Sequence, residues 1–137
     1  MRADLIAHGP RALIVEDETL IAEELRERLS RLGFFVIAAV DSAEEGIAIA
    51  VTDRPDLVLM DIRLKGEKDG VEAAQEIRQQ VDVPIVYLTA YSDQQTVDRA
   101  KRTEHDGFIL KPFHSRELQS TIEVAMKRRA MRAQKIQ

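Results

Sequence analysis

The 137-residue sequence contains no cysteine, which excludes disulfide bonds and thiolate metal sites. This absence makes a cytoplasmic location the default expectation. No apolar run approaches the roughly 18–20 residues that a membrane-spanning helix needs. Residues 1–10 have too short an apolar core for a secretory signal and are expected to form an N-terminal extension. We therefore expect one soluble domain that does not use a membrane as a partner.

The sequence also lacks a strong charge of either sign and the glycine-rich motifs of nucleotide-binding proteins. Its formal net charge is -4, which gives no general attraction to nucleic acid. Neither G-x-x-x-x-G-K-[ST] nor G-x-G-x-x-G after a strand occurs. His8, His105 and His114 are scattered, without the spacing of metal ligands. Nucleotide-binding and histidine-metal functions are therefore not indicated.

Five short apolar runs alternate with five segments of helical periodicity. The expected strands are 12–15, 34–40, 56–61, 85–88 and 107–110, and the expected helices are about 20–32, 43–50, 71–81, 93–102 and 115–133. Nearly continuous apolar runs are typical of parallel strands that are buried on both faces. Strand–helix alternation implies right-handed crossovers. We predict an α/β fold: a single-domain open five-stranded parallel sheet with helices on both faces, flavodoxin-like and doubly wound.

Polar residues follow or end four of the five expected strands. They are Glu16 and Asp17 after the first strand, Asp61 at the end of the third, Thr89 after the fourth and Lys111 after the fifth. Each alone has an ordinary interpretation as a turn or helix-cap residue. Because ligands of open parallel sheets bind outside the carboxyl ends of the strands, the joint occurrence predicts one site at that edge.

These residue types indicate phosphoryl chemistry. Clustered carboxylates repel one another, so the site is expected to contain a cation, and oxygen ligands without histidine or cysteine favour Mg²⁺. A carboxylate beside Mg²⁺ can attack phosphorus and form an aspartyl phosphate. The Lys111 ammonium can neutralise one phosphoryl oxygen, and the Thr89 hydroxyl can donate to another. The sequence therefore predicts a site that holds a phosphoryl group on Asp61.

Four motifs together resemble those of the receiver domains of two-component response regulators. They are Val15-Glu16-Asp17-Glu18, Leu57-Val58-Leu59-Met60-Asp61, Tyr87-Leu88-Thr89-Ala90 and Phe108-Ile109-Leu110-Lys111-Pro112-Phe113. Each motif is weak alone, but the ordered set is specific, and the resemblance covers residues 11–127. It implies that Asp61 accepts a phosphoryl group from a histidine kinase or a histidine phosphotransfer protein. Such a module catalyses only its own phosphorylation and dephosphorylation, so it is not an enzyme acting on an external substrate.

The resemblance also implies how Mg²⁺ and phosphate are held. The implied metal ligands are the side chains of Glu16, Asp17 and Asp61 and the backbone carbonyl of Arg63. Lys111 would pair with the phosphoryl oxygens, and its peptide bond to Pro112 is expected to be cis.

Further residues are implied to respond to the phosphoryl group or to tune its lifetime. Thr89 would move toward the phosphate, and Phe108 occupies the position of an aromatic switch residue. Phosphorylation would favour one arrangement of the fourth helix, fifth strand and last helix, and would thereby control partner binding. Arg63 and Tyr91 occupy positions that influence hydrolysis, and their bulk predicts that water reaches the acyl phosphate slowly.

Two segments depart from the pattern of this family. Residues 64–70, after Asp61, form a longer loop than is common and contain no proline. Residues 103–107 lack the usual Gly-Ala pair before the last strand, so this segment is expected to present a different surface.

Little sequence follows the last motif. Residues 128–137 are basic and are interpreted as a helix end or a linker. We expect either a stand-alone receiver that acts on a downstream protein partner or a piece of a longer chain with an output domain. The last helix and its neighbours could also mediate a homodimer. Nucleic acid is not favoured as a partner of this chain alone, because one short basic helix is weak evidence for it.

Two other functions stay open. One is a Mg²⁺-dependent phosphohydrolase with an aspartyl-phosphate intermediate, similar to the haloacid dehalogenase group. That group places its nucleophile after the first strand in a D-x-D pattern, which Glu16-Asp17-Glu18-Thr19 does not supply. The other is a pseudo-receiver that binds partners without phosphorylation, against which the complete set of acidic, Thr and Lys residues argues.

Overall fold

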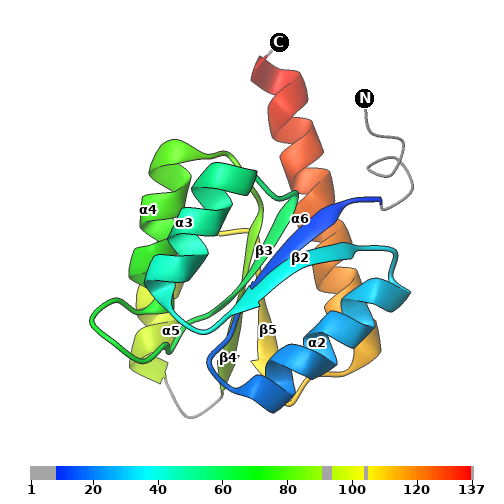
Figure 1. Cartoon of the computed structure of the whole chain (residues 1–137). Helices are drawn as coiled ribbons and strands as arrows, with labels where there is room; N and C mark the ends of the chain where they lie inside the picture. The colour runs from blue at the N-terminus through cyan, green and yellow to red at the C-terminus, as the bar shows by residue number, and fades with distance from the viewer. Residues whose placement is uncertain (1–8, 91–93, 104, 137) are drawn as a thin grey trace.

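A computed structural model describes residues 9–90, 94–103 and 105–136, the last four of them by backbone alone (Figure 1). Within these residues the elements are β1 (Arg11–Val15), α2 (Thr19–Arg31), β2 (Phe35–Val40), α3 (Ala43–Asp53), β3 (Leu57–Asp61), α4 (Gly70–Gln80), β4 (Ile85–Ala90), α5 (Gln94–Lys101), β5 (Gly107–Lys111) and α6 (Ser115–Ile136). All the strands pair in parallel, in the order β2-β1-β3-β4-β5. The predicted fold is confirmed.

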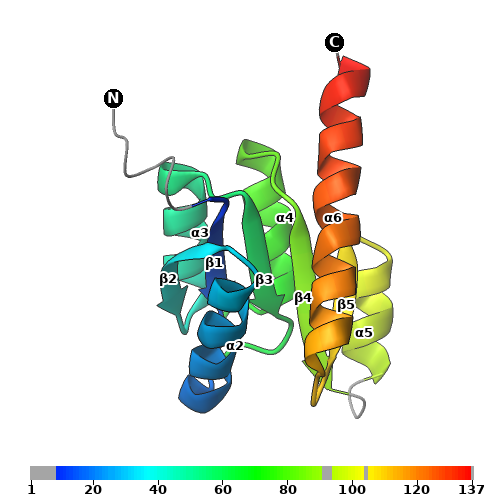
Figure 2. The same ribbon diagram turned by 90° about the vertical axis from the view of Figure 1, so that its right-hand side faces the viewer.

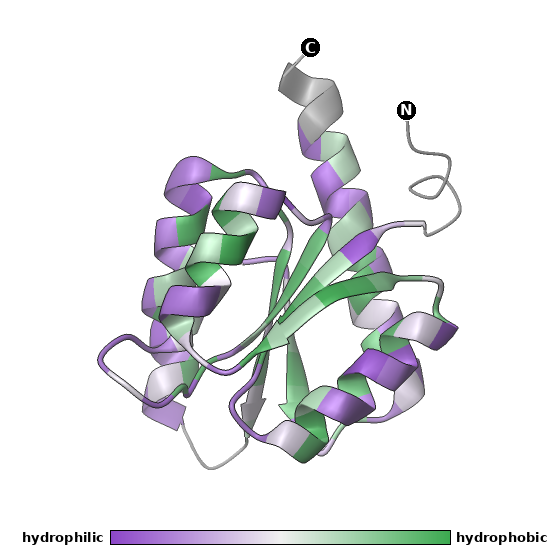
Figure 3. Cartoon of the chain, viewed as in Figure 1, coloured by the Kyte–Doolittle hydropathy of each residue, from purple (hydrophilic) through white to green (hydrophobic). Residues whose placement is uncertain are grey.

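The sheet lies between two layers of helices, with α2 and α6 on one face and α3, α4 and α5 on the other (Figures 1 and 2). Successive residues of β3 alternate between the layers: Leu57 and Leu59 pack with α2 and α6, whereas Val58 and Met60 pack with α3 and α4. The apolar sheet and the polar outer surfaces of the helices are visible in Figure 3. No helix in the described part of the chain is long and apolar enough to cross a membrane.

The ends of several helices follow from local capping groups. The Ser42 side chain accepts a hydrogen bond from the backbone N–H of Glu45 at the start of α3. Asp69 and Glu72 form a reciprocal capping box at the start of α4. Gly33 lies just beyond α2 with φ +97°, a conformation that glycine adopts without strain.

Several predicted boundaries differ from the observed ones by one to three residues, among them the ends of β4 and α6. The expected strand 85–88 continues through Ala90, because Thr89 and Ala90 still pair with Leu110 and Lys111 of β5 although the apolar run has ended. The expected helix 115–133 continues to Ile136, and its far end extends beyond the sheet (Figure 2). The first correction matters for the site, since Thr89 and Lys111 are both part of the hydrogen-bonded sheet.

Asp106, just before β5, connects three elements: the start of β4, the end of α4 and the last part of α6. Its buried carboxylate accepts a hydrogen bond of 2.8 Å from the backbone N–H of Ile85 and one of 2.9 Å from Arg132 of α6, and it is also paired with Arg78 of α4. Burial alone would raise the pKa of Asp106, but the Ile85 N–H, Arg132 and Arg78 outweigh it and hold the pKa below its usual value of 3.8. The ionised carboxylate therefore stabilises the folded state.

We expect Asp106→Asn to lower the free energy of unfolding by about 1–3 kcal/mol at neutral pH, because hydrogen bonds to a charged group are lost. The contribution of Asp106 is complete above pH 3.8 and is lost as pH falls through the lower pKa of the folded state. Urea unfolding at neutral pH and below pH 3.8 should therefore show the difference from wild type shrinking in acid. The exposed Asp53 provides the control Asp53→Asn, and an equal loss for both variants at neutral pH would contradict this role.

Candidate functional site

The carboxyl ends of β1, β3 and β5 bring three charged groups together. The Lys111 ammonium nitrogen lies 2.8 Å from Glu16 Oε1 and 3.4 Å from Asp61 Oδ2. Glu16 and Asp61 are only 2% and 4% exposed. The predicted convergence of Glu16, Asp61 and Lys111 is therefore present in the structure, as one ammonium between two buried carboxylates.

The electrostatics of this cluster are unbalanced. Burial raises the pKa of Asp61 well above its usual value, and the neighbouring Glu16 raises it further, while Lys111 and the Arg63 N–H oppose the shift. Burial alone would lower the pKa of Lys111, but Glu16 and Asp61 outweigh it and raise this pKa. One cation for two carboxylates leaves the site short of positive charge, so a further cation would stabilise ionised Asp61.

An acidic group at the end of β1 fits a metal with oxygen ligands. One carboxylate oxygen from each of Glu16, Asp17 and Glu18 lies within 4.8 Å of the others. A hollow of about 370 Å³ opens beside Glu16 and gives solvent access. Buried Glu16 Oε1 receives no hydrogen bond from the described residues, and its contact is the ion pair with Lys111. An all-oxygen set of this kind suits Mg²⁺.

This group differs from the predicted ligand set, which contains Asp61 rather than Glu18. Asp61 lies outside the group, with its carboxylate paired to Lys111. Glu18 directly follows the acidic pair, and its backbone N–H donates to Glu16 Oε2 at 3.1 Å. In the sequence, Glu18 is the third of three consecutive acidic residues, but the predicted ligand set includes only Glu16 and Asp17 of these three.

The backbone around Asp61 is fixed by several contacts. Asp61 Oδ1 accepts a hydrogen bond of 3.0 Å from the Arg63 N–H. The Ile62 N–H donates to Leu88 of β4, and the Gly70 N–H donates to the Ile62 carbonyl at 2.8 Å. Gly70 is packed so closely that an added β-carbon would lie 1.9 Å from the Asp61 carbonyl oxygen. The loop of residues 62–69 therefore returns onto the end of β3 and holds the Asp61 carboxylate in place.

The residues implied to respond to phosphate lie on β4 and β5. Thr89 is buried, and its hydroxyl donates a hydrogen bond of 3.3 Å to the backbone carbonyl of the next residue, Ala90. Phe108 is half-buried and packs against Tyr87, with ring centroids 5.5 Å apart. The predicted cis peptide bond between Lys111 and Pro112 is present. The side chain of Arg63 is exposed next to the site, whereas Tyr91 lies outside the described residues, so its role stays a prediction.

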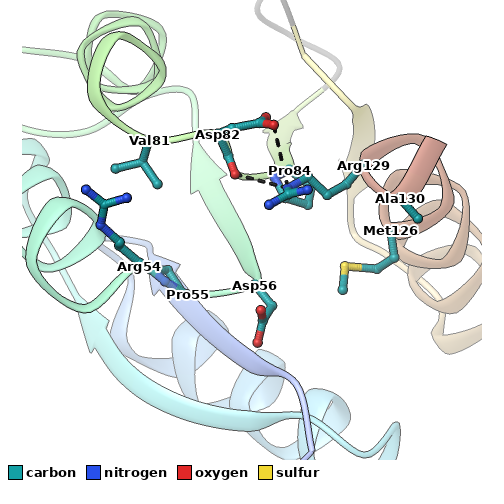
Figure 4. A pocket seen from close by; sticks show the side chains of 9 residues that line it. All are labelled: Arg54, Pro55, Asp56, Val81, Asp82, Pro84, Met126, Arg129 and Ala130. Carbon is teal, nitrogen blue, oxygen red and sulfur yellow. Dashed lines mark hydrogen bonds and ion pairs between the residues drawn. The ribbon is translucent and has the colours of Figure 1, made fainter. Parts of the chain in front are cut away.

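A second hollow lies at the opposite edge of the sheet, before the starts of β3 and β4 (Figure 4). It has a volume of about 500 Å³ and lies between the segment Arg54–Asp56, the segment Val81–Pro84 and one side of α6. Within it, Arg129 donates to the Asp82 carbonyl at 3.1 Å and also pairs with the Asp82 carboxylate. None of the predicted site residues lines this hollow, so the carboxyl edge is the candidate site.

Comparison with known proteins agrees with the geometry of that edge. Residues 12–123 match the family described as "Response regulator receiver domain". "Transcriptional regulatory protein PdtaR" of Mycobacterium tuberculosis is 37% identical over 118 residues, which are 86% of this chain and 57% of that protein. "Probable transcriptional regulator ycf27" of Guillardia theta is 39% identical over 120 residues, which are 86% of this chain and 46% of that protein. The chain therefore spans about half the length of these curated relatives.

A solved structure gives the same result. The signal receiver domain of a modulated diguanylate cyclase from Desulfovibrio desulfuricans G20 has a TM-score of 0.84 and 38% sequence identity, and the match covers 90% of this chain and 98% of that one. The family match, the curated relatives and the fold all agree with the four motifs. The chain belongs to the receiver domain family of two-component response regulators.

Proposed function

We propose that the chain is a Mg²⁺-dependent receiver in which Asp61 takes a phosphoryl group from a histidine kinase or a histidine phosphotransfer protein. The observation that carries this proposal is the buried Asp61 carboxylate at the end of β3, flanked by the Lys111 ammonium and by Glu16 of the acidic group. Such a site can hold a charged phosphoryl group by positioning and electrostatics.

In the transfer, one Asp61 oxygen forms a bond to phosphorus as the bond from phosphorus to the histidine nitrogen breaks. The electron pair of the broken bond stays on the imidazole. Lys111 faces the reacting oxygens and offsets their charge, while the Arg63 N–H holds Asp61 Oδ1. Glu16 and Asp17, with Asp61 and the Arg63 carbonyl, would hold Mg²⁺, which neutralises phosphoryl charge when bound.

The response is proposed to appear on the surface formed by α5, β5 and α6, here called the α5–β5–α6 face. The described part of α5 has one buried residue, Ala100, so few apolar contacts resist its displacement. Phosphorylation would move Thr89 toward the phosphate and change the packing of Phe108. Differential stabilisation of the two arrangements would control a downstream protein partner or an output domain. A homodimer through this face is part of the proposal.

The experiment is intact-mass analysis after incubation with acetyl phosphate and Mg²⁺. Wild type should gain one phosphoryl group, Asp61→Asn should gain none, and Asp98→Asn, which changes an exposed carboxylate of α5, should behave as wild type. After removal of acetyl phosphate, the bulk of Arg63 beside the site predicts that the modified mass persists well beyond seconds. Equal modification of wild type and Asp61→Asn would contradict the assignment.

The same experiment separates the two alternatives. Sustained release of inorganic phosphate over many turnovers would support the phosphohydrolase with an aspartyl-phosphate intermediate. An unmodified wild-type mass would support the pseudo-receiver that acts without phosphorylation.

A further inference from the structure

Three aromatic rings form a cluster on the α5–β5–α6 face: Tyr87, His105 and Phe108. The His105 and Phe108 ring centroids are 4.5 Å apart with an interplanar angle of 58°. Tyr87 lies 5.5 Å from Phe108 and 6.2 Å from His105. These centroid distances lie within the range of favourable aromatic pairs. Phe108, at the switch position, is therefore in ring contact with both Tyr87 and His105.

The two neighbours of Phe108 are held differently. Tyr87 is fully buried in β4, and its hydroxyl lies 3.3 Å from the Thr103 hydroxyl oxygen. His105 precedes β5 in the segment after α5 and is half-buried. His105 Nδ1 is buried and has no hydrogen-bond partner in the part of the chain that the structure describes. The Tyr87 side chain is therefore fixed by burial and by its contact with Thr103, whereas no hydrogen bond from the described residues holds Nδ1 of the His105 ring.

The electrostatic surroundings favour a neutral His105 ring. Burial lowers the pKa of His105 below its usual 6.5, and nearby cations lower it further, against the opposing effect of Asp106. The cations that lower this pKa are Arg128 of α6, Arg78 of α4 and Lys101 of α5. At neutral pH the contact with Phe108 is therefore one between uncharged rings.

The cluster adjoins the elements of the face that is proposed to move. Thr103, which contacts Tyr87, also donates to the Ala100 carbonyl of α5 at 2.6 Å. On the α6 side, His105 lines a hollow of about 270 Å³ together with Arg128 and Met131. Displacing Phe108 would therefore disturb a cluster that is linked to α5 through Thr103 and lines a hollow beside α6.

We propose that His105 is a positioning residue for the switch: its ring confines Phe108 against Tyr87 and stabilises the unphosphorylated arrangement over the phosphorylated one. The inference rests on the proposed function and names a residue that regulates the same site. Because the proposed switch changes the packing of Phe108 and so disrupts this contact, removing the His105 ring should make the phosphorylated arrangement easier to reach. Loss of an aromatic pair corresponds to about a 2- to 12-fold change in an equilibrium constant.

The test is titration of the full chain with beryllofluoride, a phosphoryl mimic, in Mg²⁺, followed by backbone NMR shifts. His105→Ala should bind beryllofluoride about 2- to 12-fold more tightly than wild type. His105→Phe restores a ring and should return the affinity to the wild-type value. His114→Ala removes an exposed histidine outside the cluster and should leave the affinity unchanged. A purely structural role would lower the melting temperature of His105→Ala without tightening this binding.

The outcomes separate the inference from the proposed function. Wild-type affinity, or weaker binding, in His105→Ala would overturn the role of His105 while leaving Asp61 as the phosphoacceptor. If His105→Phe bound beryllofluoride as tightly as His105→Ala, the role of His105 would also be overturned, because the presence of a ring would then make no difference. If wild type itself shows no Asp61-dependent response, the proposed function and the inference both fail.

Discussion

Replacing Lys111 with Met is expected to slow phosphoryl transfer from acetyl phosphate to Asp61 by about 10²–10³-fold, the usual effect of losing one positioned charge-stabilising group. The Met side chain has a similar length but no charge, so Glu16 and Asp61 would face each other without the ammonium that now lies 2.8 and 3.4 Å from them. The pKa of Asp61, already raised, would rise further and less of the ionised nucleophile would be present. The measurement is the rate at which the phosphorylated mass appears at fixed acetyl phosphate and Mg²⁺.

Lys65→Met is the matched control, because Lys65 is an exposed cation in the loop after Asp61. It should leave the rate close to that of wild type. A Lys111→Met rate equal to that of Lys65→Met would show that the ammonium does not act on the reacting oxygens.

Gly70→Ala is expected to destabilise the domain by at least about 2 kcal/mol, as overpacking against rigid backbone does. The added β-carbon would lie 1.9 Å from the Asp61 carbonyl oxygen and 2.9 Å from the Ile62 α-carbon, so the backbone itself must shift. Because this displacement is transmitted to the end of β3, phosphorylation of the remaining folded protein should also slow. Urea unfolding and the acetyl phosphate reaction measure the two effects.

Gly66→Ala is the matched control in the same loop, because it introduces backbone strain without a steric clash. Gly66 has φ +104°, but an added β-carbon there meets no atom within 4 Å. Its cost should therefore be about 1–2 kcal/mol of conformational strain, with little effect on the reaction rate. If phosphorylation slowed as much in Gly66→Ala as in Gly70→Ala, the specific role of the Gly70 contact would be contradicted.

The layered fold could be predicted from the sequence because each strand is a local apolar run and each helix has its own periodicity. The convergence of Glu16, Asp61 and Lys111 at the candidate site could be predicted as well, since the carboxyl ends of parallel strands must meet at one edge. Asp61 and Lys111, 50 residues apart in the sequence, are paired as this rule requires. Thr89 illustrates the limit: its place inside β4 depends on pairing with β5 rather than on its own neighbours.

Other features depend on contacts that no local pattern encodes. The apolar contact of His105 with Phe108 and Tyr87 follows from the packing of three separate segments. Asp106 has the sequence context of a turn residue, but its partners Arg78 and Arg132 come from two different helices. Long-range side-chain partnerships of this kind are set by tertiary packing, so sequence periodicity alone does not predict them.

The central claim is that modification of Asp61 changes the α5–β5–α6 face. Its most direct test is backbone hydrogen exchange, measured by mass spectrometry with and without beryllofluoride in Mg²⁺, for wild type and Asp61→Asn. The account predicts altered exchange in α5, in β5 and at the start of α6 of wild type, and no change in Asp61→Asn. Beryllofluoride bound at Asp61 of wild type, with exchange in those three segments unchanged, would contradict it.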